Sequence, residues 1–253
     1  MAKKTSVEIT IPVYNEEMEL PESVGVLYIY CTEHLDAYDW HITIADNAST
    51  DLTPSIAKQL KKAHPRVSLE RFEQKGRGRA VKAVWKKSDA DICCYMDVDL
   101  STDLSHLPKL ISSLQNGYDI AIGSRLARRS KVVGRALKRE VISRLYNFLI
   151  KIMFWTKFSD AQCGFKAVTR RAVTDLLPHI EDNEWFMDSE LLIMAEKLGY
   201  RIYEEPVLWR DNPGSTVRVL PTAMGDLYGL ARLWMRRPWE TIRQHERAYT
   251  QHD

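Results

Sequence analysis

Short apolar runs alternate with amphipathic stretches over the first half of the chain. The short runs are rich in β-branched residues, whereas the stretches between them carry apolar side chains at helical spacing. The pattern predicts strands at residues 7–13, 41–45, 67–72, 92–96 and 119–123, and helices at 21–35, 53–62 and 79–87. Because strands that alternate with helices are typical of a mostly parallel central sheet covered by helices, the predicted fold class is α/β.

The second half of the chain breaks this rhythm. Residues 125–139 are strongly basic and show little apolar periodicity, which predicts a loop or lid. Further helices are predicted at 140–158, 170–177, 188–198 and 221–234, and strands at 164–168 and 201–208. Without a repeat or a linker, we expect a single domain over 1–253, with halves at about 6–124 and 125–235 and a tail at 236–253.

Composition and charge exclude several classes of protein. With 253 residues and 45% apolar side chains, the chain can bury one substantial core. Its 36 basic and 34 acidic residues nearly balance, so we expect no nucleic-acid partner. Four cysteines lack metal-ligand spacing, which predicts buried free thiols. Since neither a signal peptide nor an apolar run of about 18 residues is visible, we expect a soluble or peripheral protein.

Two acids stand one residue apart where a predicted buried strand ends. Side chains at positions i and i+2 of an extended segment point the same way, so Asp97 and Asp99 can face one cation. Mg²⁺ and Mn²⁺ prefer oxygen ligands, which they share between carboxylates and substrate phosphates. Taken alone, the same spacing is common in surface loops, and its position at the end of a strand favours a metal site.

Three further motifs follow strands at the same predicted edge. The first strand leads into Pro12, Tyr14 and Glu16, and the second into Asp46 and Asn47. A basic segment, Lys75-Gly-Arg-Gly-Arg79, follows the third, and its glycines and cations suit a phosphate. Two turns and a solvated basic loop are the simpler interpretation. Convergence of all these motifs on one edge favours a nucleotide site.

Taken in order, the motifs resemble those of the family-2 glycosyltransferases of the dolichol-phosphate mannose synthase type. They are Ile11-Pro-Val-Tyr-Asn-Glu16, Asp46-Asn-Ala-Ser-Thr-Asp51, Asp97-Val-Asp99, Gly123-Ser-Arg125, Asp160-Ala-Gln-Cys-Gly-Phe165 and Gly199-Tyr-Arg-Ile-Tyr-Glu-Glu-Pro206, within residues 6–235. The resemblance implies a GT-A fold in which a Rossmann-like nucleotide-sugar-binding half merges with an acceptor-binding half. It also implies inverting, metal-dependent transfer of a hexose from a GDP-mannose or UDP-glucose type donor to a polyprenyl or dolichyl phosphate.

The same resemblance assigns roles on the donor side. Asp97 and Asp99 match the acids that bind Mg²⁺ or Mn²⁺. Residues that match or adjoin the donor-binding positions are Pro12, Tyr14, Glu16, Asp46, Asn47, Lys75, Arg79, Asp97 and Val98. The chain departs from the family pattern at Ser101, where the mannose synthases carry a glutamine that reaches the metal. Asn47 is a second departure, because many relatives have an acid there.

The resemblance also implies how an acceptor phosphate is held. A lipid phosphate is already an anion at neutral pH, so it attacks without a general base and needs mainly electrostatic capture. Arg125, Arg139, Ser143 and Arg210 match the family positions that bind it, and arginine suits phosphate because its planar fork donates two hydrogen bonds. These cations could instead keep a loop soluble.

Asp188 and Glu190 leave a second reaction open. Many family-2 enzymes place a catalytic base in a comparable acidic motif, which here follows Trp185. Either acid then serves as the base for a sugar hydroxyl acceptor, contacts the sugar, or caps a helix. A nucleotide-sugar-binding module without catalysis is the third alternative.

Residues 146–158 combine large apolar side chains with Lys151 and Lys157. A helix of this composition can lie in the interface of a bilayer while its lysines reach the headgroups. On composition alone, packing in the core or in a dimer is favoured. The resemblance, in which helices at this point border the lipid, makes a peripheral position at the cytoplasmic face of a membrane an equal alternative, and residues 234–239 add aromatic and basic side chains that fit it.

Overall fold

A seven-stranded, mostly parallel sheet forms the centre of the protein. The computed structural model describes residues 3–211 and 219–250. The strands lie in the order β3-β2-β1-β4-β7-β5-β8, and β7 alone runs against its neighbours β4 and β5. Their bounds are β1 Ser6–Val13, β2 Asp39–Asn47, β3 Val67–Phe72, β4 Ile92–Met96, β5 Ile120–Ser124, β7 Phe165–Thr169 and β8 Ile202–Pro206. The predicted α/β class is therefore confirmed, with β2 longer than the pattern indicated.

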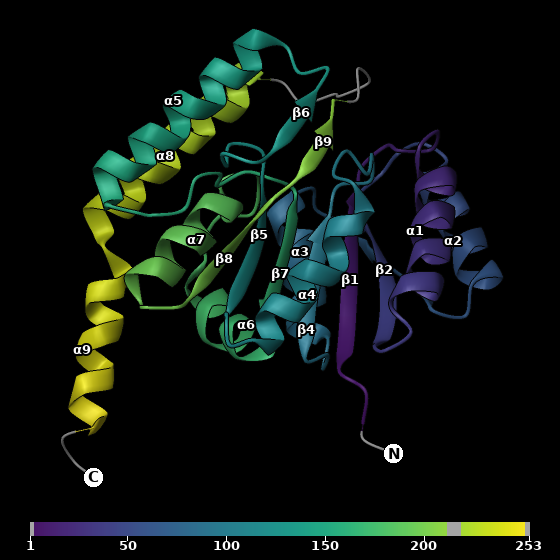
Figure 1. Ribbon diagram of the computed structural model, residues 1–253, viewed down its shortest axis with the longest axis horizontal. Helices are drawn as coiled ribbons and strands as arrows, with labels where there is room; N and C mark the ends of the chain where they lie inside the picture. Colours follow the sequence, from purple (N-terminus) through teal and green to yellow (C-terminus); the bar gives the residue numbers. More distant parts are fainter. Residues whose placement is uncertain (1–2, 212–218, 251–253) are drawn as a thin grey trace.

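Helices cover both faces of this sheet (Figure 1). On one face lie α1 (Leu20–His34), α2 (Thr53–Ala63) and α4 (Leu107–Gln115), and on the other lie α3 (Arg77–Lys87), α6 (Arg170–Leu176) and α7 (Met187–Lys197). Two longer helices, α5 (Leu137–Phe154) and α8 (Val219–Arg236), lie side by side beyond α7. The last described helix is α9 (Pro238–Thr250), which lies within the segment predicted to be a tail.

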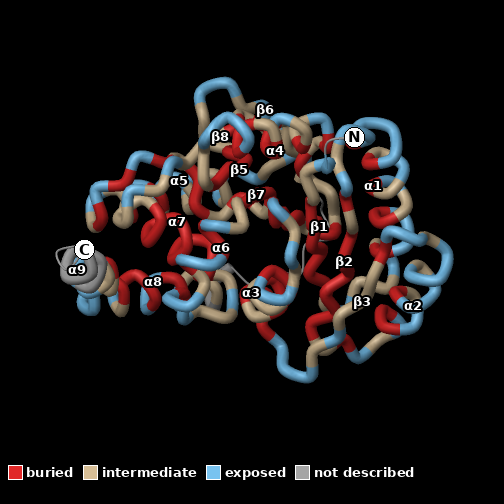
Figure 2. Tube along the Cα trace, turned by 90° about the horizontal axis from the view of Figure 1, so that it is seen from below, coloured by how far each residue is buried: buried red, intermediate tan, exposed pale blue. Residues whose placement is uncertain are grey.

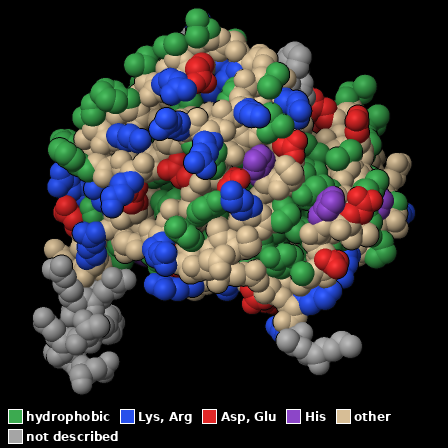
Figure 3. Space-filling view, viewed as in Figure 1, with side chains coloured by type: hydrophobic (Ala, Val, Ile, Leu, Met, Phe, Trp, Pro, Cys, Tyr) green, Lys and Arg blue, Asp and Glu red, His purple; other side chains and the backbone are tan. Residues whose placement is uncertain are grey.

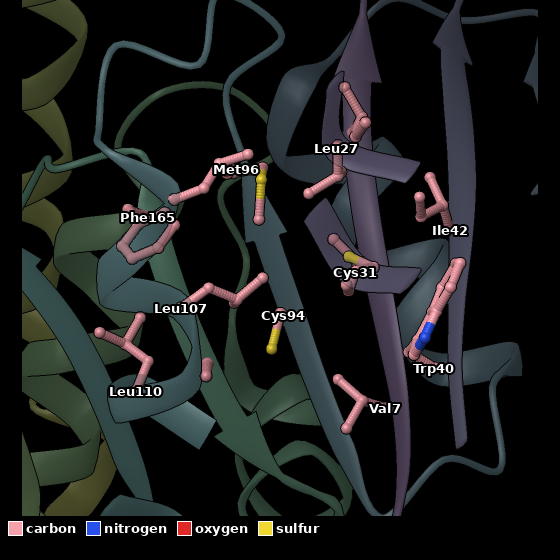
Figure 4. Close-up of a cluster of buried hydrophobic side chains, with 14 of the residues drawn as sticks. Val7, Leu27, Cys31, Trp40, Ile42, Cys94, Met96, Leu107, Leu110 and Phe165 are labelled. Carbon is pink, nitrogen blue, oxygen red and sulfur yellow. The ribbon is translucent and has the colours of Figure 1, made fainter. Parts of the chain in front are cut away.

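Side chains of the central strands point alternately to the two faces of the sheet, and each face has its own hydrophobic core. Along β4, Cys94 and Met96 pack with α1 and α4, whereas Cys93 and Tyr95 face α3 and α7. Figure 2 shows the buried strands between half-exposed helices, and Figure 4 shows the first core around Leu27, Leu107 and Phe165. A strand buried on both faces is expected to be apolar throughout, as β4 is. All four cysteines are buried free thiols, as predicted.

The basic stretch 125–139 is not one continuous loop. It contains β6 (Lys131–Val133), which pairs in parallel with β9 (Leu208–Arg210), and it ends inside the first turn of α5. The prediction missed β6 because the strand has only three residues and gains its pairing from a segment more than 70 residues away. Helix α5 also ends earlier than predicted, at Phe154, where Trp155 adopts a left-handed conformation with φ 54°.

Candidate active site

The polar motifs meet at the carboxyl edge of the parallel strands. β1, β2 and β4 each end there in a loop that contains a non-glycine residue with positive φ: Asn15 at 56°, Ala48 at 63° and Leu100 at 46°. Such conformations are costly, and they cluster where a loop must present groups in a fixed direction. Hydrogen bonds hold two of these loops together, because Asn15 N–H donates to Ser49 Oγ and Thr50 N–H donates to Asn15 Oδ1.

Asp97 and Asp99 lie directly beyond β4 in a small pocket. Its lining includes both acids, Ser101, Gly164 and Trp209. The backbone N–H and the hydroxyl of Ser101 donate to the two oxygens of Asp99, at 3.0 and 2.7 Å. The serine that replaces the family's glutamine therefore orients the second acid of the pair.

The electrostatics of this edge suit a divalent cation. Burial and then the charge of Asp97 raise the pKa of Asp99. Burial, aided by neighbouring carboxylates that include Asp99 and Asp97, raises the pKa of Glu16 to about 7. Among the described residues, however, no group of three metal-binding side chains is close enough to enclose an ion. Mg²⁺ characteristically binds one or two carboxylates and completes its shell with water and phosphate oxygens, so Asp97 and Asp99 fit that mode of binding.

One carboxylate oxygen of Asp46 accepts no hydrogen bond from the described residues. It is fully buried, and its Oδ1 accepts a hydrogen bond from Ser49 N–H at 3.0 Å. Its Oδ2 lies 3.5 Å from Arg71 Nε but has no hydrogen-bond partner among the described residues. The neighbouring Asn47 is used internally, because its Oδ1 accepts from Gly76 N–H at 2.6 Å. Of these two residues, Asp46 is the one with an oxygen that lacks a hydrogen bond, and an N–H group of a nucleobase would satisfy it.

The glycines of the basic segment have a packing role. A Cβ on Gly76 would lie 2.7 Å from Asn183 O, and one on Gly78 would lie 2.7 Å from Met187 Cβ. Arg79 N–H already donates to Asn183 O at 3.0 Å, so a carbonyl occupies the start of α3. The absence of a side chain at these glycines is thus required by loop 182–185, and the approach of a phosphate to their backbone stays a prediction.

The cations of that segment have different environments. The ammonium of Lys75 is exposed and lies 3.5 Å from the centre of the Tyr14 ring, in a loop beside the donor motifs. Arg79 Nη1 donates to the carbonyl of Lys75 at 2.7 Å. Pro12 continues β1 in register with Ala45, and Val98 is 7% exposed and packs in the first core. A contact from Val98 to a donor would therefore involve its backbone.

Sequence analysis missed a buried network of charges beneath Asp97. Arg77 donates to Asp97 Oδ1 at 2.6 Å and to Asp188 Oδ2 at 2.9 Å, and the side chain is 9% exposed. The fully buried Lys166 lies 3.0 Å from Asp188 Oδ1, which also accepts from the Tyr95 hydroxyl. Burial alone would raise the pKa of Asp188, but Lys166 and Arg77 hold it below its usual value. A carboxylate whose two oxygens are both occupied by hydrogen bonds and cations, and whose pKa is lowered, is a weak base.

Glu190 faces a different part of the molecule. Its Oε1 accepts from Arg232 Nη2 at 2.7 Å, and its Oε2 accepts from Asp182 N–H at 2.7 Å. Burial raises its pKa. These contacts attach α8 and the loop before α7 to one carboxylate. A catalytic role for Glu190 stays a prediction, while its observed contacts are those of a tether.

Arg125 is bound by an internal acid. Its Nε and Nη2 donate to the two oxygens of Asp160, at 2.7 and 2.8 Å, and its backbone N–H donates to the same side chain. Asp160 is fully buried, which by itself would raise its pKa, but the charge and the hydrogen bonds of Arg125 together hold that pKa below its usual value. The bidentate pair anchors the start of the basic stretch, so Arg125 has few donors left for an acceptor phosphate.

The other predicted phosphate ligands gather around β9. Ser143 accepts from Arg135 Nη2 at 2.5 Å, and Arg139 Nη1 donates to Asp211 at 2.9 Å. Arg210 is 63% exposed and lies 3.5 Å from Asp103. Arg135, which we did not single out, lies 5.6 Å from the centre of the Trp209 ring. Arg135 lies in the basic stretch 125–139, but the many lysines and arginines there have no periodic spacing that would single it out.

Backbone hydrogen bonds attach this cluster to the loop that carries the metal acids. Arg210 N–H donates to Ser101 O at 2.8 Å, and Asp103 N–H donates to Leu208 O at 3.0 Å. Thr102 and Trp209 form an isolated antiparallel bridge between these bonds. Two acids for a cation and an arginine cluster therefore lie within one connected region.

The sequence matches the family model for glycosyl transferase family 2 over residues 8–177. The chain belongs to glycosyl transferase family 2. Glycosyltransferase AglD of Haloferax volcanii is 33% identical over 92% of this chain, but the match spans only 38% of AglD. A dolichyl-phosphate beta-glucosyltransferase of Trichomonas vaginalis is 29% identical over 84% of the chain and 68% of its own length, and one of Saccharomyces cerevisiae is 26% identical over 83% and 68%.

Solved structures with the same fold confirm the predicted GT-A architecture of this family-2 member. Glucosyl-3-phosphoglycerate synthase of Mycobacterium tuberculosis, in complex with uridine diphosphate, superposes with a TM-score of 0.65 at 19% identity, covering 92% of this chain and 80% of that one. The mannosyltransferase PcManGT of Pyrobaculum calidifontis, in complex with GDP-Man and Mn²⁺, gives a TM-score of 0.54 at 17% identity, covering 83% and 57%.

Proposed function

We propose that the protein transfers a hexose from a nucleoside diphosphate sugar to a polyprenyl or dolichyl phosphate, with inversion at the anomeric carbon. The observation that carries the proposal is the connection of Asp97 and Asp99 to an arginine cluster through β9. Relatives named dolichyl-phosphate beta-glucosyltransferases support glucose as the sugar and dolichyl phosphate as the acceptor. UDP-glucose is therefore the first donor to test, followed by GDP-mannose.

Asp97 and Asp99 would hold Mg²⁺ or Mn²⁺ against the donor diphosphate. The cation supplies charge that stabilises the leaving diphosphate. Asp46 Oδ2 would accept from the base, while Tyr14 and Lys75 border that position. An oxygen of the lipid phosphate forms the new bond to the anomeric carbon as the bond from that carbon to the diphosphate breaks. Arg135, Arg139, Ser143 and Arg210 would orient the attacking phosphate.

Transfer to a sugar hydroxyl is the alternative reaction, and it requires a base. Asp188 is saturated by cations and its pKa is lowered, while Glu190 is tied to Arg232. Both environments favour a phosphate acceptor, which needs no base. Asp188→Asn and Glu190→Gln discriminate between the reactions, because a loss of several orders of magnitude in rate with intact donor binding would identify a base.

An exposed apolar stripe on α5 supports a membrane-bound acceptor. Its members recur every three or four residues, and they are Leu137, Val141, Leu145, Phe148, Ile152 and Trp155. Helix α8 adds exposed Met224, Leu227, Tyr228, Trp234 and Met235 beside it. Figure 3 shows apolar side chains next to lysine and arginine at the upper left, where α5 lies in Figure 1. Within the described residues, every helix is too short or too polar to span a bilayer. From the exposed apolar stripe we propose peripheral binding to a membrane, and the family resemblance favours its cytoplasmic face.

The proposed reaction is tested by incubating the protein with Mn²⁺, labelled UDP-glucose or GDP-mannose, and a short polyprenyl phosphate. A labelled product that partitions into organic solvent is expected with one donor. Product that forms only with a sugar hydroxyl acceptor would support the alternative reaction. Binding of nucleotide without transfer to any acceptor would instead favour a module without catalytic activity.

A further inference from the structure

A buried carboxylate on α8 has one oxygen without a partner. Asp226 is 4% exposed, and its Oδ2 accepts a hydrogen bond from Gln162 Nε2 at 2.8 Å. Its Oδ1 has no hydrogen-bond partner within residues 3–211 and 219–250. Burial raises the pKa of Asp226 to about 6, so the group is mostly an anion at neutral pH. An unsatisfied buried acceptor is unfavourable for folding, and a ligand that donates to it would offset that penalty.

The partner of Asp226 leads directly to the metal acids. Gln162 stands two residues before Gly164, and two extended residues span at most about 7 Å. Gly164 touches Asp97, because a Cβ on this glycine would lie 1.8 Å from Asp97 Oδ2. Asp97 N–H also donates to Gly164 O at 3.1 Å. The Asp226–Gln162 pair therefore lies one short loop away from the expected diphosphate position.

Side chains of α5 and α7 connect the same carboxylate to the buried network. Burial and then the negative charge of Asp226 raise the pKa of the Tyr146 hydroxyl. The Tyr146 hydroxyl is 2.8 Å from Ser189 Oγ, and Ser189 follows Asp188 in α7. Asp188 connects to Asp97 through Arg77. The hydrogen bond to Gln162 and the short loop to Gly164 thus connect Asp226 to Asp97.

The charge around Asp226 selects the chemistry of its ligand. Asp182 and Asp188 both contribute negative charge that raises the pKa of Asp226. A phosphate beside the buried Asp226 carboxylate would bring two anions together in a site of low polarity, which is unfavourable. A neutral group that donates hydrogen bonds is favoured instead, and neighbouring hydroxyl groups of a sugar ring satisfy an acceptor oxygen without adding charge.

We propose that Asp226 and Gln162 form the subsite for hydroxyl groups of the transferred sugar. Asp226 Oδ1 accepts from a sugar hydroxyl, while Gln162 fixes the carboxylate through its Oδ2. The subsite determines which sugar the protein prefers, because a change in the position of that hydroxyl leaves the buried oxygen unsatisfied. This inference rests on the proposed function only in taking a nucleotide sugar as the ligand.

Binding measurements without an acceptor test the subsite. Isothermal titration with Mn²⁺ compares UDP-glucose with UDP, and GDP-mannose with GDP, in the wild type and in Asp226→Ala and Asp226→Asn. We expect the alanine variant to bind the preferred nucleotide sugar about 10- to 100-fold more weakly while binding its nucleoside diphosphate within about twofold of wild type. Asp226→Asn keeps the shape of the side chain, so weaker sugar binding in this variant cannot be attributed to loss of the fold. Asp175→Ala, an acid on α6 that is 46% exposed, is the matched control.

Donors that lack single hydroxyl groups identify the contact. Removal of the hydroxyl that binds Asp226 should weaken binding to the wild type and leave binding to Asp226→Ala unchanged. Equal weakening of nucleotide sugar and nucleoside diphosphate in both variants would overturn the subsite and assign Asp226 a purely structural role. Absence of a lipid product from a wild-type protein that shows the expected sugar-dependent binding would reject the proposed acceptor and retain the subsite.

Discussion

The backbone of Gly164 lies against the carboxylate of Asp97. A Cβ at position 164 would lie 1.8 Å from Asp97 Oδ2 and 2.3 Å from its Cγ. No real Cβ contact is that short, so any other residue at this position forces the acid to turn away. The glycine in the motif that precedes β7 therefore fixes the position of Asp97, an acid of the proposed metal site, because it has no side chain.

Gly164→Ala should reduce transfer by about 100-fold or more, because displacement of Asp97 removes a ligand of the cation. Mn²⁺ affinity, measured by titration, should fall together with activity. Gly25→Ala is the control, since a Cβ there meets nothing within 4 Å and alanine favours the interior of α1. Full activity in Gly164→Ala would contradict the assigned position of Asp97.

Asp99→Asn tests the second acid of the pair. It keeps both contacts to Ser101 available while removing a negative charge, so transfer should fall by about 100-fold at fixed Mn²⁺. Treatment with a chelator should abolish transfer by the wild type, and added Mn²⁺ should restore it. A variant that retains wild-type rate and metal dependence would remove Asp99 from the site.

Arg77→Met should destabilise the fold by about 3–5 kcal/mol, because it leaves Asp97 and Asp188 with one buried cation, Lys166, in place of two. Unfolding in urea measures the change. Arg77→Lys retains the charge but not the fork that reaches both acids, and we expect an intermediate loss. A change below about 1 kcal/mol in the methionine variant would show that the network contributes little to stability.

Glu8→Gln should stabilise the protein at pH 8 by about 1–3 kcal/mol. Burial raises the pKa of Glu8 from 4.5 to about 7, and its Oε1 has no hydrogen-bond partner among the described residues. Between those pH values the folded state keeps a proton that the unfolded chain has released, so the stability contributed by this group falls as pH rises. Chemical unfolding at pH 4, 6 and 8 should show a weaker pH dependence in the variant.

The exposed Glu33→Gln is the control for that series, since its carboxylate is 64% exposed. It should leave the pH dependence of stability unchanged. Equal pH profiles for Glu8→Gln and wild type would show that the Glu8 carboxyl is solvated in the folded protein.

Replacement of Leu145, Phe148 and Ile152 by serine should weaken binding to anionic lipid vesicles by about 10-fold or more, because three exposed apolar side chains leave the bilayer interface. Co-flotation with the vesicles measures the partitioning. Val26→Ser with Ile29→Ser, on the exposed face of α1, is the matched control and should bind as wild type does. Equal loss in both variants would exclude α5 as the membrane-binding helix.

The sequence predicted most helices and strands because each has its own periodicity and the strands of the parallel half follow one another. It could not predict that β7 enters antiparallel between β4 and β5, since both pairings join segments that are far apart in the chain, such as Met96 with Phe165 and Ile122 with Lys166. Asp97 and Asp99 were recognisable from their place after an apolar strand. The roles of Arg77 and Arg125 could not be recognised, because the sequence around an arginine does not show which buried acid it will bind in the folded protein.

The bond from Arg210 N–H to Ser101 O has a kinetic consequence. The turn that carries Asp99 and the strand that presents Arg210 share one rigid ladder, so neither shifts alone. In the proposed reaction, a nucleotide sugar that fixes the turn would set the opposite strand in place before the lipid phosphate binds. Such coupling would favour a compulsory order of binding, with the donor first, and would keep the anomeric carbon from being activated while the position of the nucleophile is undefined.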